Sequence, residues 1–139
     1  MKSKYAPLVK LKKKSLDGAE RNLIAANNAL SSASDKLSHA YTALSHMALP
    51  TKGSVGEFSQ ATAMIHAQHQ TIEEYQRVFH DAQQKQILMR ERFKVAQIDY
   101  EKFKYLEVQE MNAYAKMLKD KEAKMLDEIG TMMYKREAL

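Results

Sequence analysis

The sequence contains no cysteine, and it has only 4 glycines and 2 prolines among its 139 residues. Without cysteine the chain can form neither a disulfide framework nor a cysteine-ligated zinc site. Because turn-favouring residues are so few and 45 % of the residues are hydrophobic, we expect a few very long helices. There is no run of 18 apolar residues and no apolar stretch typical of a signal peptide, so we expect a soluble, unprocessed, intracellular protein.

Motifs that carry enzymatic chemistry are also missing. There is no P-loop, no G-x-G-x-x-G and no nucleophile motif, and four scattered glycines cannot form a phosphate-binding loop. Two carboxylate pairs occur, Glu73 with Glu74 and Asp127 with Glu128. Because adjacent side chains on a helix point in different directions, neither pair can act as a general acid/base couple. The sequence predicts a protein that is not an enzyme and has no cofactor.

Three side chains that could ligate a metal share one predicted helical face: His66, His69 and Glu73. A carboxylate-bridged di-metal site, however, takes its ligands from four helices. The segment expected to face these three residues contains alanine, leucine and serine, which supply no further strong ligand. We therefore expect no metal site.

Basic residues are concentrated at the N-terminus. Six lysines precede Leu16 with no acidic residue among them, and removing these six from the 22 basic residues leaves 16 against 17 acidic ones. Such a basic N-terminal segment could bind an acidic protein, a phosphate-bearing surface or nucleic acid, or it could be a solvated terminus without a partner. It contains neither arginine nor asparagine, the residues that read base edges, so we expect no nucleic-acid binding.

A heptad repeat dominates the first third of the chain. Leucine recurs every seven residues over 16–44, and alanine does so over 19–40. Sustained over more than four heptads, this pattern predicts a long helix in a coiled coil. Pro7 suits the first turn of a helix, and Pro50 disfavours helical conformation at Leu49, so the first helix is expected over about residues 7–49.

A second helix is expected after a turn at residues 50–54. Ser54 and Glu57 form an S-x-x-E capping box immediately before Phe58, so the helix is expected over about residues 55–137. Its apolar stripe has the same 3-4 spacing and comprises Phe58, Ala61, Ile65, Gln68, Ile72, Tyr75, Phe79, Ala82, Gln86, Met89, Phe93, Ala96, Tyr100 and Phe103.

The two stripes fit each other in an antiparallel arrangement. A turn centred near Lys52 places residue i roughly opposite residue 105 − i, so that Ala33 meets Ile72 and Ala26 meets Phe79. Small residues facing large ones allow the helices to approach closely. The sequence predicts an all-α fold: a long two-helix antiparallel coiled-coil hairpin, forming a single rod over residues 1–139, with the second helix extending beyond the first.

In this register Lys2 faces Phe103, and the helical pattern continues to Leu139. Residues 104–139 would overhang by about 36 residues, or roughly 54 Å. At Glu107 the stripe spacing becomes 4-4, a stutter that marks a change of partner. The overhang keeps an apolar stripe of Met111, Tyr114, Leu118, Met125, Ile129 and Met132. Two kinds of partner could cover this stripe. One is a different protein, and the other is a second copy of the chain in a homodimer through residues 104–139.

The layout resembles the FliJ family, the coiled-coil proteins of the flagellar type III export apparatus. Three motifs carry the resemblance. The first is Tyr5-x-Pro7-Leu8-x-x-Leu11 followed by lysines and heptads. The second is the start of the second apolar stripe, from Phe58 through Ile65 to His69. The third is Glu122-x-x-x-Leu126-Asp127-Glu128-Ile129.

The resemblance implies a rod similar to the central stalk of rotary ATPases. It would insert into the export ATPase ring, contact the cytosolic domain of the membrane export gate and bind export chaperones, in the cytoplasm at the cytoplasmic face of the inner membrane. The ring contacts expected by matching positions are Leu126, Asp127, Glu128, Ile129 and Met132. The expected gate contacts are Phe58, Ile65 and His69, although Thr62 departs from the apolar residue usual in the family. A self-associating structural coiled coil and a chaperone that never enters the ring are the alternatives.

Overall fold

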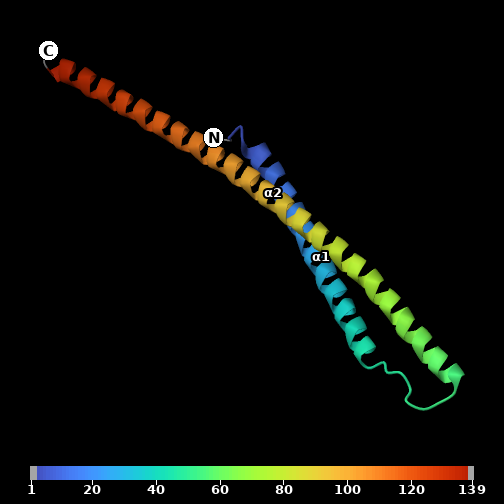
Figure 1. The fold of residues 1–139 in the computed structure, drawn as a ribbon. Helices are drawn as coiled ribbons and strands as arrows, with labels where there is room; N and C mark the ends of the chain where they lie inside the picture. The colour runs from blue at the N-terminus through green and yellow to red at the C-terminus, as the bar shows by residue number, and fades with distance from the viewer. Residues whose placement is uncertain (1–2, 138–139) are drawn as a thin grey trace. The chain divides into compact units, whose positions relative to one another are not determined.

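The computed structural model describes residues 3–137, which form two α-helices and no strand (Figure 1). Helix α1 spans Ala6–Ser45 and helix α2 spans Val55–Glu137. The predicted all-α helical hairpin is confirmed. The chain divides into two compact units, Asp17–Val95 and Met1–Leu16 with Ala96–Leu139, and each unit contains part of both helices. The predicted positions of Lys2 and Leu139 lie outside the described residues.

Helix α1 begins at Ala6 because Ser3 satisfies the first backbone donors. The Tyr5 N–H donates to Ser3 Oγ at 3.1 Å, and the Ala6 N–H donates to the Ser3 carbonyl at 3.2 Å. The helix ends at Ser45 rather than at Leu49. There the Ser45 hydroxyl donates to the Thr42 carbonyl at 2.6 Å, which satisfies one of the final carbonyls.

Helix α2 begins with the Ser54 N-cap. Ser54 Oγ accepts a hydrogen bond from the Glu57 N–H at 3.2 Å, and the Phe58 N–H donates to the Ser54 carbonyl at 3.1 Å. Gly53 precedes the cap with a φ of +153°, a conformation that residues with a side chain rarely adopt. The sequence thus supplies both the residue that starts the helix and the glycine that lets the chain turn into it.

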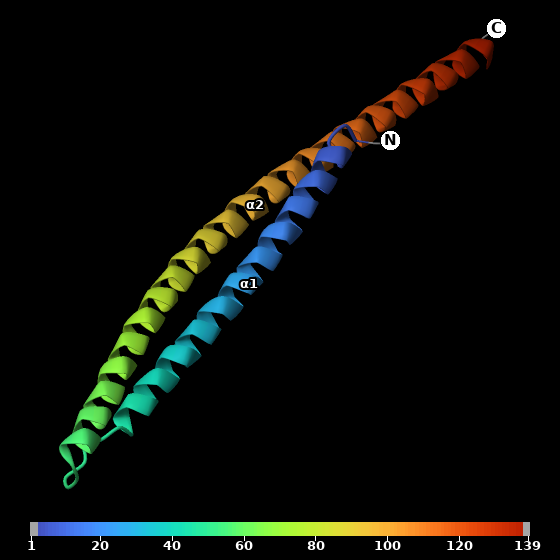
Figure 2. The same ribbon diagram turned by 90° about the vertical axis from the view of Figure 1, so that its right-hand side faces the viewer.

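Within the unit Asp17–Val95 the two helices lie side by side in both views (Figures 1 and 2). Gln86 Nε2 donates to Asn27 Oδ1 at 3.1 Å, and Gln68 Nε2 donates to the Ala40 carbonyl at 2.9 Å. Residue i therefore lies roughly opposite residue 112 − i. The predicted register of 105 − i is wrong by about one heptad, a shift that preserves the heptad pattern on both helices.

Buried side chains occur at heptad positions of both helices in this unit. They are Ala26, Ala33, Ala40, Ile72, Gln86 and Met89. Gln86 is the polar member of this set. In the observed register it lies opposite Ala26 and donates to Asn27. In the predicted register it would lie opposite Ala19, with Glu20 as another acceptor in the place of Asn27, so this bond alone does not select the register.

The unit formed by Met1–Leu16 and Ala96–Leu139 has the same register. Ser3 Oγ donates to Glu110 Oε2 at 2.7 Å, and Lys12 Nζ lies 3.5 Å from Asp99 Oδ2. The pairing with α1 thus reaches Glu110, inside the interval where the stripe spacing changes. The overhang predicted to start at residue 104 therefore starts about one heptad later.

The same shift changes what covers the start of α2. Because α1 ends at Ser45, the first turns of α2 lie beside the connecting segment 46–54 instead of α1. Met47 and Ala48 line one shallow pocket together with Ala61, Met64 and Ile65. The connection therefore packs along α2 and is not the tight turn at 50–54 that the prolines and glycines indicated.

Candidate partner-binding surfaces

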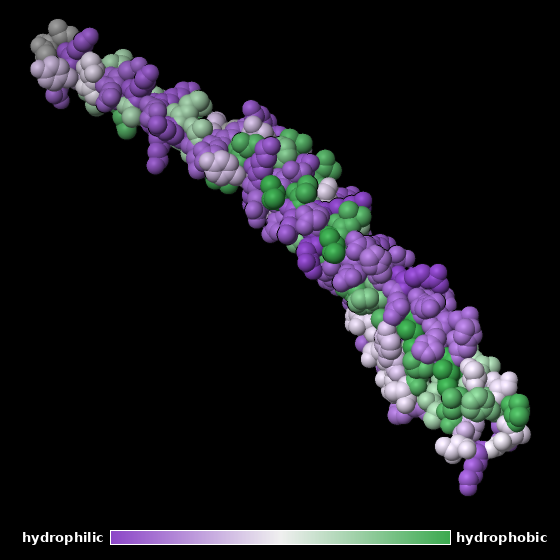
Figure 3. All heavy atoms as spheres, in the orientation of Figure 1, coloured by the Kyte–Doolittle hydropathy of each residue, from purple (hydrophilic) through white to green (hydrophobic). Residues whose placement is uncertain are grey.

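The first surface is residues 111–137 of α2, here named the C-terminal segment. It makes no hydrogen bond, ion pair or ring contact to the described residues of α1. At about 1.5 Å per residue, its roughly 27 residues extend for about 40 Å. Along this segment green apolar and purple polar side chains alternate on the face shown in Figure 3, at the upper left. The segment is therefore a single helix whose side chains are available to a partner.

Exposed apolar side chains are frequent along the C-terminal segment. They are Met111, Met117, Leu118, Met125, Leu126, Ile129, Met132, Met133 and Tyr134. Exposed patches of this kind mark interaction sites in soluble proteins, and the flexible methionine side chain adapts to more than one packing arrangement. The charged side chains of the segment are balanced, six basic against five acidic. Apolar contact is therefore its main means of attracting a partner.

The five predicted ring contacts all lie in this segment and are all exposed. Leu126 is 69 % exposed, Ile129 50 % and Met132 70 %. Successive residues of a helix are turned by about 100°, so residues 126–129 point in four directions around the axis. Ile129 and Met132 continue one stripe, whereas Asp127 lies on the opposite side. The structure therefore distributes these contacts around the helix and does not gather them on one face.

The second surface lies at the start of α2 and includes the predicted gate contacts. Phe58 is 49 % exposed, Ile65 is half-buried and His69 is exposed. Spacings of seven and four residues put the three side chains on adjoining sides of one helical face. Phe58 also lines a shallow pocket with residues 50–55 of the connection. Phe58 and Ile65 are therefore covered by the connecting segment and not by α1.

Sequence reasoning missed three exposed apolar residues at this end. Leu49 is in the connection, and Val55 and Met64 are in the first turns of α2. These three residues and Phe58, all exposed and all in the connection or the first turns of α2, are here named the turn-end cluster. One signal in the sequence could have indicated them. The apolar stripe of the second helix extends to Phe58, whereas the end of the first helix is rich in hydroxyl side chains and cannot cover the stripe that far.

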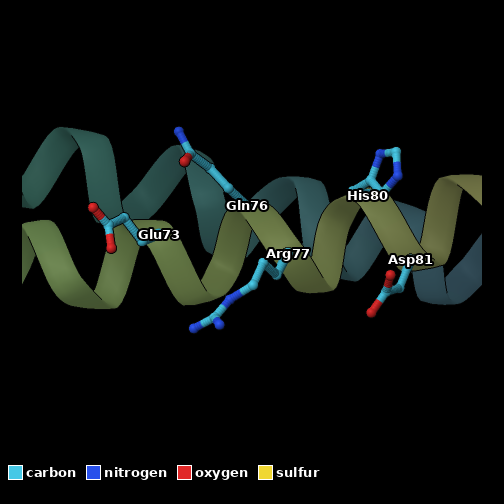
Figure 4. Close-up of a pocket in the computed structure, with 5 residues that line it drawn as sticks. All are labelled: Glu73, Gln76, Arg77, His80 and Asp81. Carbon is cyan, nitrogen blue, oxygen red and sulfur yellow. The ribbon is translucent and has the colours of Figure 1, made fainter.

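A further shallow pocket lies on α2 alone (Figure 4). Arg77 and Asp81 point to one side of the helix, Gln76 and His80 point to the other, and Glu73 lies between them across the front of the helix. Gln76 Nε2 donates to Tyr41 Oη of α1 at 2.5 Å. All five pocket residues are exposed, so the pocket cannot exclude water from a reaction.

The predicted histidine group is also on this exposed part of α2. His66 Nε2 lies 3.4 Å from Gln70 Nε2, and His69 and Glu73 are exposed. Within residues 3–137 no three histidine or carboxylate side chains gather in the way a metal ion requires. The group is therefore part of the solvated face of the helix.

Comparison with family models gives one match, to the flagellar FliJ protein, over residues 1–139. The chain belongs to the FliJ family. FliJ proteins are structural components of flagellar protein export, so this chain is a component of the flagellar export apparatus. Neither the search of curated proteins nor the search of solved structures gave a match. No helix within the described residues is long and apolar enough to cross a membrane.

The residues that carry the FliJ likeness lie at three separate places in the two helices. Tyr5 and Pro7 are at the start of α1, Phe58 is in the first turns of α2, and Leu126 is in the C-terminal segment. For a FliJ-family chain the turn-end cluster and the C-terminal segment are thus two candidate contact surfaces, each apolar and each without cover from α1.

Proposed function

We propose that this FliJ-family protein acts as a non-enzymatic, stalk-like component of flagellar export. Its C-terminal segment inserts into the ring of the export ATPase, and its turn-end cluster contacts the cytosolic domain of the membrane export gate. It works in the cytoplasm, peripherally at the cytoplasmic face of the inner membrane. Export chaperones are further partners in this proposal.

One observation carries the ring proposal: the C-terminal segment is a single helix with exposed apolar side chains around its circumference. A flat partner can cover only one side of a helix, which leaves either Asp127 or Ile129 out of contact. A ring encloses the helix and can reach Leu126, Asp127, Glu128 and Ile129 together. Met132 extends the same contact by one turn.

The gate proposal is supported by the register of the two helices. Because α1 ends before it can cover the start of α2, Phe58 is half-exposed although it belongs to the seam stripe. Ile65 and His69 lie next to it on the same helix. A partner that displaced the short connection would gain the apolar surface of Phe58 and Ile65 with little disturbance of the helix pairing.

The apolar stripe also favours a second candidate, a self-associating coiled coil. Two C-terminal segments could pair through Met125, Ile129 and Met132, which recur at the spacing of a helix-packing stripe. In that case the C-terminal segment would hold a dimer together and would be unavailable to a ring. A chaperone that binds export substrates without entering the ring is the third reading.

The discriminating experiment is ATP hydrolysis by the cognate export ATPase, with and without this protein. The full chain is compared with a form lacking residues 120–139 and with Leu126→Ala/Ile129→Ala. Val78→Ala, which shortens an exposed apolar side chain elsewhere on α2, is the matched control. We expect the full chain and the control to raise the hydrolysis rate, and the other two forms to lose that effect.

The state of association separates the alternatives. If the full chain leaves the hydrolysis rate unchanged and sediments as a dimer that the truncation abolishes, the stalk proposal fails and the structural coiled coil is supported. If the full chain is a monomer without effect on the rate but binds export chaperones, the protein acts outside the ring.

A further inference from the structure

The N-terminal part of α1 has a basic outer face that neither the ring nor the gate proposal uses. The described residues 3–16 include five lysines and no acidic side chain. Lys12 is directed toward α2, with its Nζ 3.5 Å from Asp99 Oδ2 and 5.5 Å from the centre of the Phe103 ring. Lys4, Lys10 and Lys14 are exposed. Their charges therefore face solvent.

Two leucines are exposed between these lysines. Leu11 is 57 % exposed and Leu8 39 %. At 100° per residue, Leu8, Leu11 and Lys14 fall within about 120° of the helix circumference, and Lys10 lies about 40° beyond this arc. Lys4 is in the turn that precedes the helix. Val9 and Leu16 are on the other side, toward α2. This arrangement of Lys4, Leu8, Lys10, Leu11 and Lys14 is named the basic leucine face.

Lysines of α2 add to the charge at the same end. Lys104 of α2 has its Nζ atom 5.8 Å from the Tyr100 ring centre, and Lys13 of α1 has its Nζ atom 5.4 Å from the same centre. Lys102 lies 5.9 Å from the centre of Phe103, the ring that Lys12 also approaches. Over residues 3–16 and 96–110 there are seven lysines against four carboxylates. Two of those carboxylates already have partners: Asp99 is bound by Lys12 of α1, and Glu110 by Ser3, which precedes α1.

We propose that the basic leucine face binds the surface of a bilayer that contains anionic phospholipids. Lysine side chains next to exposed leucines on one side of a helix are typical of helices that lie in the membrane interface. The leucines enter the boundary of the acyl chains while the lysine stems lie along it and their ammonium groups remain at the headgroups.

The chemistry of the face favours lipid over other anionic partners. A nucleic acid offers phosphates for the lysines but nothing to receive Leu8 and Leu11, and the face has no arginine for base edges or for bidentate phosphate contact. A bilayer offers both a diffuse negative charge and an apolar layer beneath it. This inference does not depend on the ring proposal, because it concerns a different helix and needs no ATPase.

The test is flotation of the full-length protein with vesicles at about 0.15 M salt. One set of vesicles contains phosphatidylglycerol and phosphatidylcholine in equal parts, and the other only phosphatidylcholine. The variants are Lys10→Gln/Lys14→Gln and Leu11→Gln. The matched control, Lys119→Gln/Lys121→Gln, removes the same charge from exposed positions of the C-terminal segment. All the replaced side chains are exposed and glutamine favours helix, so circular dichroism should be unchanged.

We expect the protein to float with the phosphatidylglycerol vesicles and not with the pure phosphatidylcholine vesicles. Each lysine near an anionic surface contributes about fivefold to partitioning, so Lys10→Gln/Lys14→Gln should lower binding by about 25-fold. Leu11→Gln should also lower it, and the control should retain wild-type binding.

Three results would overturn the proposal. The first is an absence of binding to the anionic vesicles. The second is an equal loss in the control and in the Lys10 and Lys14 variant, because binding would then depend on net charge alone. The third is that Leu11→Gln binds normally while duplex DNA displaces the vesicles at equal phosphate concentration, which would assign the face to nucleic acid.

Discussion

Replacing Gln86 by leucine should make the hairpin more stable without changing its register. Gln86 is 8 % exposed and donates one hydrogen bond to Asn27 Oδ1 at 3.1 Å. Losing that bond costs about 1 kcal/mol. Burying a leucine side chain contributes about 1.5–3 kcal/mol, part of which the glutamine stem already supplies. Since Asn27 is exposed and can bond to water, we expect a net gain of about 1 kcal/mol.

The register should not change in Gln86→Leu. Sliding the helices by one heptad keeps leucine and alanine at the seam and puts Glu20, another acceptor, in the place of Asn27. The slide would instead break the contacts of Ser3 with Glu110 and of Lys12 with Asp99, which the substitution leaves in place. The variant should therefore keep the 112 − i register while its free energy of unfolding increases.

The absence of native cysteine makes this measurable by disulfide trapping. Ile72→Cys is combined with Ala40→Cys, which reports the observed register, or with Ala33→Cys, which reports the slid one. In the wild-type background we expect oxidation to cross-link positions 40 and 72 and to leave 33 and 72 reduced. In the Gln86→Leu background we expect the same result. Urea denaturation of the variant without added cysteines gives the stability change.

Two results would refute this reasoning. Cross-linking of positions 33 and 72 in the Gln86→Leu background alone would mean that the bond between Gln86 and Asn27 does select the register. A decrease in stability in Gln86→Leu would mean that the buried amide contributes more than the hydrogen bond to Asn27.

Three smaller predictions concern the unit Asp17–Val95 and are checked by urea denaturation followed by circular dichroism. Ala40→Leu should lower the free energy of unfolding by about 1–3 kcal/mol, because Ala40 is buried and a larger side chain would force the helices apart. Gly18→Ala should raise it by about 1 kcal/mol, because the added methyl group meets only one atom, at 3.8 Å; a decrease would contradict the helical environment of this glycine. Ser54→Ala should lower it by about 1 kcal/mol through loss of the N-cap, whereas Ser54→Asp should restore most of it.

Much of the secondary structure was predictable because its causes are local. Capping by Ser54 depends on residues within one turn, and the heptads depend on side chains three and four positions apart. The end of α1 was less predictable. Pro50 marks a position that the helix cannot pass, but α1 ends five residues earlier, at Ser45, and no residue type at that position marks the end.

The candidate surfaces were predictable in part. Sequence spacing located the apolar stripe of the C-terminal segment, including Ile129 and Met132, and the exposure of these residues follows from the absence of α1 beside them. The environment of Phe58 and Ile65 could not be predicted from spacing. They lie on the seam stripe, and only the alignment of the helices determines whether α1 or the connection covers them.

The sequence by itself determined that this chain forms two long helices, which side of each faces the other, and that the second is much longer. The tertiary structure alone decided which heptad of α1 faces which heptad of α2. The physical reason is that a heptad repeat matches itself again after every seven residues, so apolar packing is nearly the same in neighbouring registers. The neighbouring registers are distinguished by contacts between residues far apart in sequence: Ser3 with Glu110, and Lys12 with Asp99.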